Sequence, residues 1–319
     1  MKKIYLIADI GGTNIRLALV IDNNITNLQI YKAHEYKNIL DVISLYLNNF
    51  AKNFKVKDGI IAIAATILSD TITMTNINWQ FSINNLKEKL NFNSLRVIND
   101  FEAQALCIEH LKLNDTTLIC KSSSNISNNR RVILGPGTGL GVSLLVKIDE
   151  VWQVIPAEAG HTVIGFYNNL EQQILSYITN QLNCEPYAEK LISGNGIVNI
   201  YNALLYINKL PIKNNITAQD IYNLVLQNNS IALQSIDLFF NFLGTFVGNC
   251  IVSYLPYDGV YLTGGVLPKL LPYFMKSNFA NRLQNKNLPT IQNIINNTAV
   301  HLITAENPAL IGLKSLCLK

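Results

Sequence analysis

A turn of two glycines between two apolar segments, close to the N-terminus, constrains the fold more than any other feature of the chain. The segment Ile4–Ala8 is apolar and β-prone, the turn follows at Asp9–Asn14 (DIGGTN), and alternating apolar residues from Ile15 predict a second strand. Because glycine lacks a Cβ atom, Gly11 and Gly12 let the chain turn tightly and bring backbone N–H groups against an anion. The pattern predicts a phosphate-binding turn between two strands, although a purely structural turn has the same sequence signature.

A second glycine cluster repeats this arrangement in the middle of the chain. Arg131–Leu134 is predicted to be a strand, the turn Gly135–Gly141 (GPGTGLG) again contains a threonine, and Val142–Val146 predicts another strand. A third cluster, Gly259–Pro268 (GVYLTGGVLP), is a strand that ends in paired glycines, which suits a close backbone approach to a flat ligand such as adenine. Three such clusters in this order indicate two related lobes, with one phosphate-binding turn in each.

The spacing within the first turn separates two classes of phosphate loop. Asp9–Thr13 has the form D-x-G-x-T and lies between two strands, so it resembles the phosphate-binding hairpin of actin-like ATPases and sugar kinases. It does not match the Walker A loop, which has the form G-x-x-x-x-G-K-[ST] and precedes a helix.

Composition narrows the class of protein further. The chain has 319 residues, of which 49% are apolar and 14% charged, enough for two globular domains with a sizeable core. A net charge of +4, spread along the chain, is too small to indicate a nucleic-acid surface. The five cysteines and four histidines are widely spaced and show no metal-binding pattern. We therefore expect reduced, mostly buried thiols in a cytoplasmic protein.

Alternating strand and helix signals predict an α/β protein. The long apolar segment Ser230–Leu255 contains interrupting polar residues, so we expect a buried central helix rather than a membrane span. A polar stretch at Lys121–Arg130 predicts an exposed loop, and Thr217–Asp220 predicts a helix start with a capping box. Further expected elements are strands at Gly59–Ala65 and Leu95–Ile98 and helices at Ile39–Phe50, Phe101 to about His110, Leu170–Leu182 and Ile197–Ile207.

A carboxylate stands where a predicted strand gives way to a helix, at Val97–Phe101 (VINDF). Asp100 is the residue type that takes a proton from a sugar hydroxyl, and Asn99 adds a directional amide beside it. A kinase that acts on an alcohol needs one such base, while positioning and Mg²⁺ supply most of the catalysis. The alternative is that Asp100 only caps the helix N-terminus.

Three more polar residues are candidates for binding sugar hydroxyls. Glu158 and His161 lie in a segment of small residues just after the second glycine turn, with no bulky neighbour to bury them. Glu158 can accept hydrogen bonds from two hydroxyls, and His161 can donate or accept one more. Glu189 is the third candidate, and a solvated helix face is the alternative reading of its position.

These landmarks together resemble the ATP-dependent bacterial glucokinases outside the ROK group, within the hexokinase/actin-like superfamily. They follow the order and spacing of that family from residue 4 to about residue 313, at Asp9–Thr13, Met74–Asn76 with Trp79, Val97–Phe101, Gly135–Gly141, Glu158–His161, Ala188–Gly194 and Leu262–Pro268. The resemblance implies an α/β protein with the two-lobed ribonuclease H-like/actin-like ATPase fold and a central ligand cleft. We expect a small lobe at 1–110 plus a C-terminal helix at about 307–319, and a large lobe at 111–306.

The resemblance also implies an activity, namely transfer of the γ-phosphoryl group of ATP to the 6-hydroxyl of glucose with Mg²⁺. Asp100 is implied as the base, and Asp9 is implied to face Mg²⁺ through a water molecule. The implied glucose ligands are Asn99, Asp100, Glu158, His161 and Glu189. The implied nucleotide-binding residues are Asp9, Gly11, Gly12, Thr13, Asn14, Gly135, Gly137, Thr138, Gly139, Gly264 and Gly265. Glucose and ATP are the expected partners, without nucleic acid or membrane, and the oligomeric state stays open, a homodimer included.

The sequence departs from the family pattern at four positions. Alanine replaces glycine at Ala157 and Ala159, and Thr66 and Asn195 stand where proline is usual. If Ala157 or Ala159 adopts a left-handed backbone, it is strained, and the turns without proline are looser. These changes predict weaker glucose binding without loss of any hydroxyl ligand.

Three rival functions use the same fold. A kinase for another hexose or an amino sugar, including the ROK type, is the nearest, but the cysteine-rich zinc loop of the ROK group is absent from this sequence. A sugar-responsive transcription factor would need a helix-turn-helix before a strand that here begins by Ile4. A cytoskeletal ATPase would lack the sugar-binding set around Asp100 and Glu158.

Overall fold

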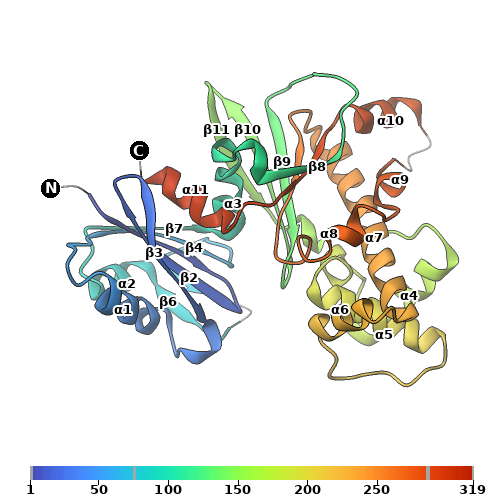
Figure 1. The fold of residues 1–319 in the computed structure, drawn as a ribbon, viewed down its shortest axis with the longest axis horizontal. Coiled ribbons are helices and arrows are strands. Elements are labelled where there is room, and N and C mark those ends of the chain that lie inside the picture. Colours follow the sequence, from blue (N-terminus) through green and yellow to red (C-terminus); the bar gives the residue numbers. More distant parts are fainter. Residues whose placement is uncertain (1–2, 75–76, 285–287, 318–319) are drawn as a thin grey trace. The chain divides into compact units, whose positions relative to one another are not determined.

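Two compact units make up the computed structural model, which describes residues 3–74, 77–284 and 288–317. The first unit comprises Met1–Asp115, Val154–Pro156 and Ala305–Lys319, and the second comprises Thr116–Gln153 and Ala157–Thr304. Figure 1 labels the elements of both units along the chain.

A five-stranded sheet forms the framework of the first unit, with the strand order β3-β2-β1-β4-β7. The strands β1, β2 and β3 are antiparallel neighbours, whereas β4 and β7 continue the sheet parallel to β1. The elements of this unit are β1 (Tyr5–Ile10), β2 (Asn14–Ile21), β3 (Asn24–Lys32), α1 (Ile39–Phe50), β4 (Asp58–Ile63), β5 (Thr71–Thr73), β6 (Gln80–Ser82), α2 (Ile83–Lys89), β7 (Ser94–Asn99), α3 (Asp100–Leu106) and α11 (Pro308–Leu316).

A six-stranded sheet in the second unit has the order β11-β10-β9-β12-β13-β8. Its hairpin β9–β10 is followed by the parallel strands β12 and β13, so the pattern of the first sheet recurs. The elements of this unit are β8 (Thr116–Cys120), β9 (Arg130–Pro136), β10 (Leu140–Ile148), β11 (Val151–Ala157), α4 (Asn169–Leu182), α5 (Gly194–Ile207), α6 (Ala218–Leu226), α7 (Ser230–Tyr254), β12 (Val260–Leu262), α8 (Leu271–Phe274), α9 (Phe279–Leu283), α10 (Pro289–Asn296) and β13 (Val300–Ile303).

The central strands of the first sheet, β1 and β4, are covered on both faces, because consecutive residues along them are buried rather than alternate ones. Leu6 and Ala8 of β1 point into one core with α1, whereas Ile7 points into a second core with α3 and α11. Alternation of side chains along a strand produces this division. Gly312 of α11 packs so closely on α3 that a Cβ there would lie 1.8 Å from the carbonyl oxygen of Ala103. Both helices therefore depend on one glycine for their contact.

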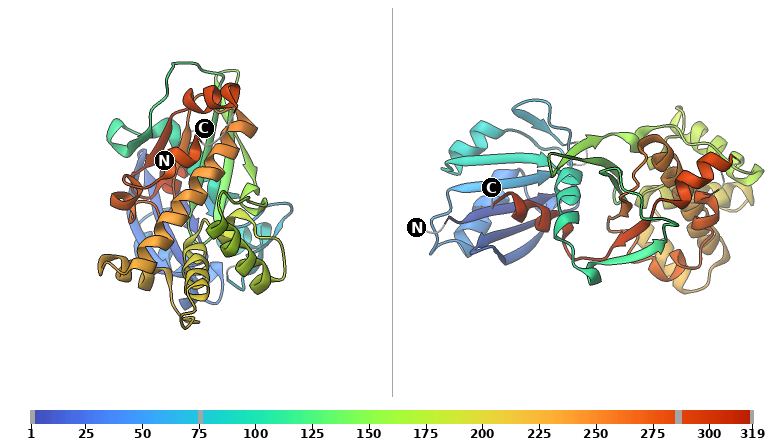
Figure 2. Two further views of the ribbon diagram at one scale, coloured as in Figure 1. Left: turned by 90° about the vertical axis from the view of Figure 1, so that its right-hand side faces the viewer. Right: turned by 90° about the horizontal axis from the view of Figure 1, so that it is seen from above.

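The long helix α7 is the centre of the second unit (orange in Figure 2). Its apolar side chains belong to one core that also contains Val132 and Leu134 of β9 and residues of α5. By length and composition α7 could cross a membrane, but 72% of its most apolar 18-residue window is buried inside the protein. The prediction of a buried central helix is confirmed.

Most other predicted elements are also present. The helix at Ile39–Phe50 has the expected bounds, and the capping box at Thr217 forms as predicted. The expected helix from Phe101 to His110 is divided into α3 and a separate 3₁₀ helix, Ile108–His110. All five cysteines are free, but Cys184 is exposed, so the expectation of mostly buried thiols is only partly right.

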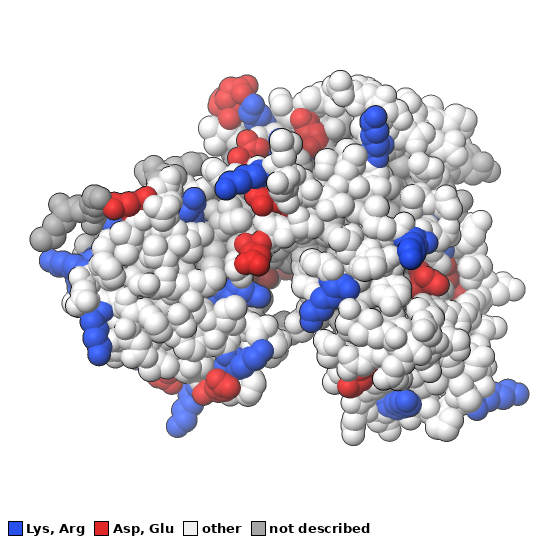
Figure 3. All heavy atoms as spheres, in the orientation of Figure 1, with Lys and Arg blue, Asp and Glu red and all other residues white. Residues whose placement is uncertain are grey.

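Charged side chains are sparse on the surface. On the face drawn in Figure 3 they are scattered, with both signs present on each unit and no continuous patch of one sign. This distribution agrees with the small net charge of +4.

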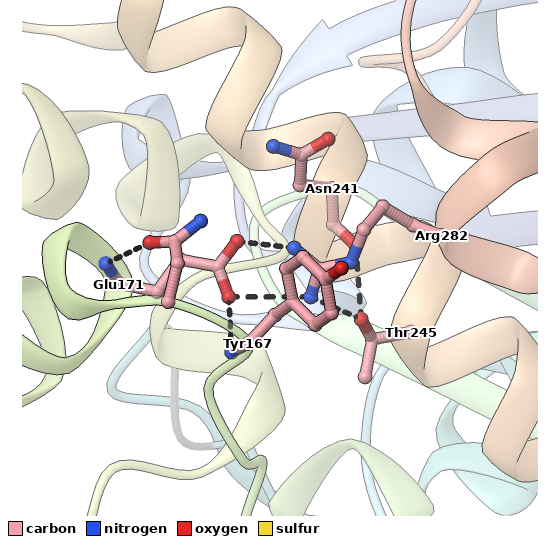
Figure 4. A network of polar contacts seen from close by, with 6 residues as sticks. Tyr167, Glu171, Asn241, Thr245 and Arg282 are labelled. Carbon is pink, nitrogen blue, oxygen red and sulfur yellow. Dashed lines mark hydrogen bonds and ion pairs between the residues drawn. The ribbon is translucent and has the colours of Figure 1, made fainter. Parts of the chain in front are cut away.

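A buried ion pair joins α4, α9 and α7 in the second unit (Figure 4). The guanidinium of Arg282 donates hydrogen bonds to both carboxylate oxygens of Glu171, and a further one to Oγ1 of Thr245 at 2.7 Å. The ring of Tyr167 covers the guanidinium at 4.9 Å, and the backbone N–H of Tyr167 donates to Glu171 at 2.8 Å. Removing a charge pair from water is costly, so these extra bonds are what make the buried pair tolerable.

Candidate active site

The first glycine turn lies at the carboxyl end of β1 and connects β1 to β2. The backbone N–H of Gly11 donates to the carbonyl of Asn14 at 3.1 Å, which closes the turn, and Thr13 is exposed at its tip. A Cβ at Gly11 would lie 3.3 Å from the same carbonyl, closer than most such contacts. The carboxyl ends of β4 and β7 lie at the same edge of the sheet, since both run parallel to β1. Ligands of open α/β sheets bind at this edge.

A carboxylate precedes this turn. Asp9 pairs with Arg16 across the β1–β2 hairpin, and the Arg16 guanidinium lies 3.1 Å from Asp9 Oδ2. Burial raises the pKa of the Asp9 carboxyl above its ordinary value, while the charge and hydrogen bond of Arg16 oppose that rise. Arg16 was not among the predicted site residues. Its pairing with Asp9 could have been predicted from the hairpin, because the two residues lie directly opposite each other on β1 and β2.

Asn99 and Asp100 lie where β7 ends and α3 begins, and the structure shows which of them caps the helix. Asn99 is the N-cap of α3, and its side-chain oxygen accepts from the backbone N–H groups of Phe101 and Glu102 at 2.8 and 3.3 Å. Its amide nitrogen donates to the carbonyl of Ala65 at 3.3 Å. Asn99 is therefore the N-cap, and Oδ1 of Asp100 also accepts from the backbone N–H of Phe101 at 3.0 Å. Whether Asp100 acts as a base or only supports the start of the helix stays a prediction. It lies in the first turn of α3, where a carboxylate is favoured by the helix dipole.

The second glycine turn lies at the carboxyl end of β9 and mirrors the first. The backbone N–H of Gly137 donates to the carbonyl of Gly139 at 2.8 Å, and Thr138 is exposed at the tip. Gly137 faces open space, where a Cβ would meet no atom within 4 Å. The two turns thus present the same arrangement of backbone and threonine, each between the two strands of an antiparallel hairpin.

The third glycine cluster packs directly against this second turn. A Cβ at Gly135 would lie 2.4 Å from the carbonyl oxygen of Thr263, and one at Gly264 would lie 2.4 Å from that of Pro136. Gly264 also has a φ of +95°, which disfavours any other residue. Protein packing accounts for these two glycines without a ligand. Gly265 differs because a Cβ there would meet nothing within 4 Å.

Glu158 and His161 lie side by side at a short 3₁₀ helix, Ala159–His161, that follows β11; Glu158 is the N-cap of this helix and His161 its last residue. Nδ1 of His161 lies 3.3 Å from Oε2 of Glu158, and their side chains are 53% and 65% exposed. The ring of His161 packs against that of Tyr187, with 5.2 Å between centroids. Exposure agrees with the prediction that nothing bulky buries the pair, and it leaves polar atoms accessible to a ligand.

Glu189 is held at the second glycine turn. Its Oε2 accepts a hydrogen bond from the backbone N–H of Leu140 at 3.0 Å, although the two residues are 49 positions apart. It lies on the 3₁₀ helix Ala188–Lys190, so the alternative of a solvated helix face is wrong. The segment is also tied to the turn by Gly194, whose N–H donates to the carbonyl of Gly137 at 2.9 Å.

The departures from the family pattern do not strain the backbone. Neither Ala157 nor Ala159 has a positive φ, because Ala157 ends β11 and Ala159 begins a 3₁₀ helix. Asn195 lies in the first turn of α5 rather than in a loose loop. The expected strain at the alanines is therefore wrong. Of the Met74–Asn76 landmark, Thr75 and Asn76 lie outside the described residues.

The predicted residues thus form one group in each unit. Asp9, the first turn, Asn99 and Asp100 belong to the first unit, and the second turn, Glu158, His161, Glu189 and the third glycine cluster belong to the second. Within the described residues, no group of three or more histidines, cysteines or carboxylates could hold a metal ion. A single carboxylate such as Asp9 suits Mg²⁺, which usually keeps several waters and binds one or two carboxylates and substrate phosphates.

Comparison with known proteins identifies the family. A sequence model described as Glucokinase matches residues 6–319. The chain belongs to the Glucokinase family. Its curated relatives include the glucokinase of Salmonella heidelberg (strain SL476), which is 34% identical over 316 residues, covering 98% of this chain and 96% of the relative. The "Bifunctional protein glk" of Burkholderia thailandensis is 35% identical over 312 residues. The alignment covers 98% of this chain but only 48% of that longer protein, so the chain spans about half the length of this relative.

Solved structures of other glucokinases share the fold. A glucokinase from an Antarctic psychrotroph superposes with a TM-score of 0.83 at 27% identity, covering 99% of both chains. A ROK family glucokinase from Streptomyces griseus, solved with glucose and AMPPNP, has a TM-score of 0.65 at 18% identity, covering 99% of both chains. The predicted fold class, that of actin-like sugar kinases, is confirmed.

Proposed function

We propose that this chain is a cytoplasmic glucokinase, which transfers the γ-phosphoryl group of ATP to the 6-hydroxyl of glucose and releases glucose 6-phosphate and ADP. Membership of the Glucokinase family over nearly the whole chain is the observation that carries the proposal. The site residues support it, because each unit has a glycine turn with an exposed threonine and polar groups suited to sugar hydroxyls beside it. Glucose and ATP are the partners in this proposal, and neither nucleic acid nor membrane takes part.

The roles follow from the chemistry of the residues. Asp100 accepts the proton of the 6-hydroxyl as its oxygen attacks the γ-phosphorus, and the bond from that phosphorus to the β,γ-bridging oxygen breaks. Asn99 has one N–H beyond its bond to Ala65 for a sugar hydroxyl, while its oxygen is used in capping α3. Glu158, His161 and Glu189 orient the sugar through its other hydroxyls. The backbone N–H groups of the two glycine turns stabilise the phosphate charge.

Asp9 would hold Mg²⁺, directly or through water, and Arg16 fixes the orientation of that carboxylate. The bound ion would neutralise charge on the β- and γ-phosphate oxygens. Asp9 is suited to this because its side chain stays 16% exposed despite the pairing with Arg16.

An assay of ADP release with ATP, Mg²⁺ and a panel of hexoses tests the proposal. Glucose should give a higher kcat/KM than fructose or N-acetylmannosamine. A folded preparation that phosphorylates an amino sugar with a kcat/KM about tenfold above that for glucose would contradict it, because the ratio of kcat/KM values defines which sugar the enzyme prefers. Mass spectrometry of the product would locate the phosphate on the 6-hydroxyl.

A further inference from the structure

Glu189 occupies an unusual place for a sugar ligand, because its carboxylate is bonded to the backbone of the phosphate turn. Oε2 lies 3.0 Å from the N–H of Leu140, the residue that follows Gly139. A Cβ on Gly139 would lie only 2.4 Å from the same oxygen, so the carboxylate lies directly against the turn.

Leu140 also contacts the segment that carries His161, another candidate sugar ligand. A Cβ on Gly160 would lie 2.1 Å from the carbonyl oxygen of Leu140, so the helix that carries His161 packs on Leu140. The backbone N–H of Ala188 donates to the carbonyl of Thr162 at 2.9 Å, which joins the segments of His161 and Glu189. The phosphate turn and both sugar-binding segments therefore form one bonded assembly within the second unit.

A carboxylate at this position opposes the binding of phosphate. Its negative charge repels a phosphate at the turn, and it already accepts from an N–H group of that turn. When sugar hydroxyls donate hydrogen bonds to Glu189, they share its charge and draw it toward the sugar. The repulsion felt by a phosphate then becomes smaller.

We propose that Glu189 couples the two substrates, so that bound glucose tightens the binding of the nucleotide and bound nucleotide tightens the binding of glucose. One carboxylate oxygen holds the Leu140 N–H while the other receives a glucose hydroxyl. This inference rests on the proposed function, since it requires that glucose and nucleotide bind here. Thermodynamic linkage makes the effect reciprocal. Its size is the ratio of the Kd of the nucleotide without glucose to its Kd with saturating glucose.

Calorimetric titration of MgADP, with and without saturating glucose, measures the coupling without turnover. We expect glucose to lower the Kd of MgADP in the wild type by about fivefold or more, the lower end of typical coupling factors. Glu189→Gln removes the charge but keeps an oxygen that can accept from Leu140. It should bind MgADP more tightly than the wild type when glucose is absent, bind glucose more weakly, and show a coupling factor near 1.

Two further variants separate this role from a general loss of charge or structure. Gly139→Ala keeps the carboxylate, and its backbone φ is ordinary for alanine, but the new methyl group displaces Oε2. It should also bring the coupling factor close to 1. Glu185→Gln is the matched control, since Glu185 is exposed four positions earlier and lies outside the proposed site. It should keep the wild-type coupling, and circular dichroism should show all three variants folded.

The outcomes separate the two proposals. If Glu189→Gln keeps the wild-type coupling while glucose binds more weakly, Glu189 is a sugar ligand only and the coupling proposal is wrong. If it weakens MgADP binding alone, Glu189 merely supports the turn, which also contradicts the coupling. If the wild type binds neither glucose nor MgADP, the proposed function fails, and the coupling falls with it.

Discussion

At the scale of single residues, Asn99 and Asp100 share the start of α3. Asn99 is the N-cap and accepts from the N–H groups of Phe101 and Glu102, while Oδ1 of Asp100 accepts from the same N–H of Phe101 at 3.0 Å. Because Asn99 alone bonds both N–H groups, the helix start does not depend on the charge of Asp100. The proposed role of Asp100 as a base can therefore be tested by a variant that removes only this charge.

Asp100→Asn keeps the shape of the side chain and removes the base. Loss of a general base lowers the rate by about 10²–10⁴. We expect kcat to fall by that factor, while the melting temperature stays close to that of the wild type because Asn99 still caps α3. Steady-state kinetics and calorimetry measure both quantities. A folded variant with nearly normal kcat would show that Asp100 is not the base.

At the scale of elements, the helices within each unit are joined by a different kind of contact. In the first unit, α11 and α3 touch through backbone at Gly312, and α3 carries Asp100. In the second, α4, α7 and α9 share the buried pair of Glu171 and Arg282. A change at either contact alters how whole helices sit, rather than one side chain.

Gly312→Ala should displace α3, because the new methyl group would lie 1.8 Å from the Ala103 carbonyl. Overpacking of this kind costs about 1–3 kcal/mol. We expect a lower free energy of unfolding together with a lower kcat, since Asp100 moves with the helix. Ser315→Ala is the control on the same helix, as it removes an internal hydrogen bond and adds no atom. Equal stability and activity of Gly312→Ala and the control would mean that α11 shifts without moving α3.

Glu171→Gln leaves the Arg282 guanidinium buried without a counter-charge. Breaking a buried pair by removing one partner costs about 3–5 kcal/mol, whereas replacing both partners with apolar residues of similar size is often nearly neutral. The single variant should therefore unfold at a much lower urea concentration, and Glu171→Leu combined with Arg282→Met should recover most of the loss. A double variant less stable than Glu171→Gln would show that Thr245 and Tyr167 depend on the charge pair.

At the scale of the whole molecule, the proposed function predicts that a ligand of the native state stabilises the fold. Glucose at about 100 times its Kd should raise the free energy of unfolding by about 2.7 kcal/mol. The melting temperature should rise with glucose and stay unchanged with a sugar alcohol of similar size. Asp100→Asn should keep most of this rise, because binding does not require the base. A melting temperature insensitive to glucose would contradict sugar binding by the native protein.

Local sequence patterns were sufficient to predict most helices and strands of this protein. Period-two and period-3.6 patterns predicted the strands around both glycine turns and the helices at Ile39–Phe50 and Ser230–Leu255, since such patterns depend on neighbours in the chain. The motif order also led to the correct family and fold class. The division of the chain into functional lobes and the roles of the site residues stay predictions.

Contacts between residues far apart in the sequence became known from the structure alone. The bond between Glu189 and Leu140 spans 49 positions, and no periodicity encodes such a contact. The close packing at Gly264 is another example, because a Cβ there would lie 2.4 Å from the carbonyl oxygen of Pro136, which belongs to another turn. The expected strain at Ala157 and Ala159 failed for the same reason. Backbone angles there follow from how β11 and the next helix pack, and that packing is settled by contacts between elements far apart in the sequence.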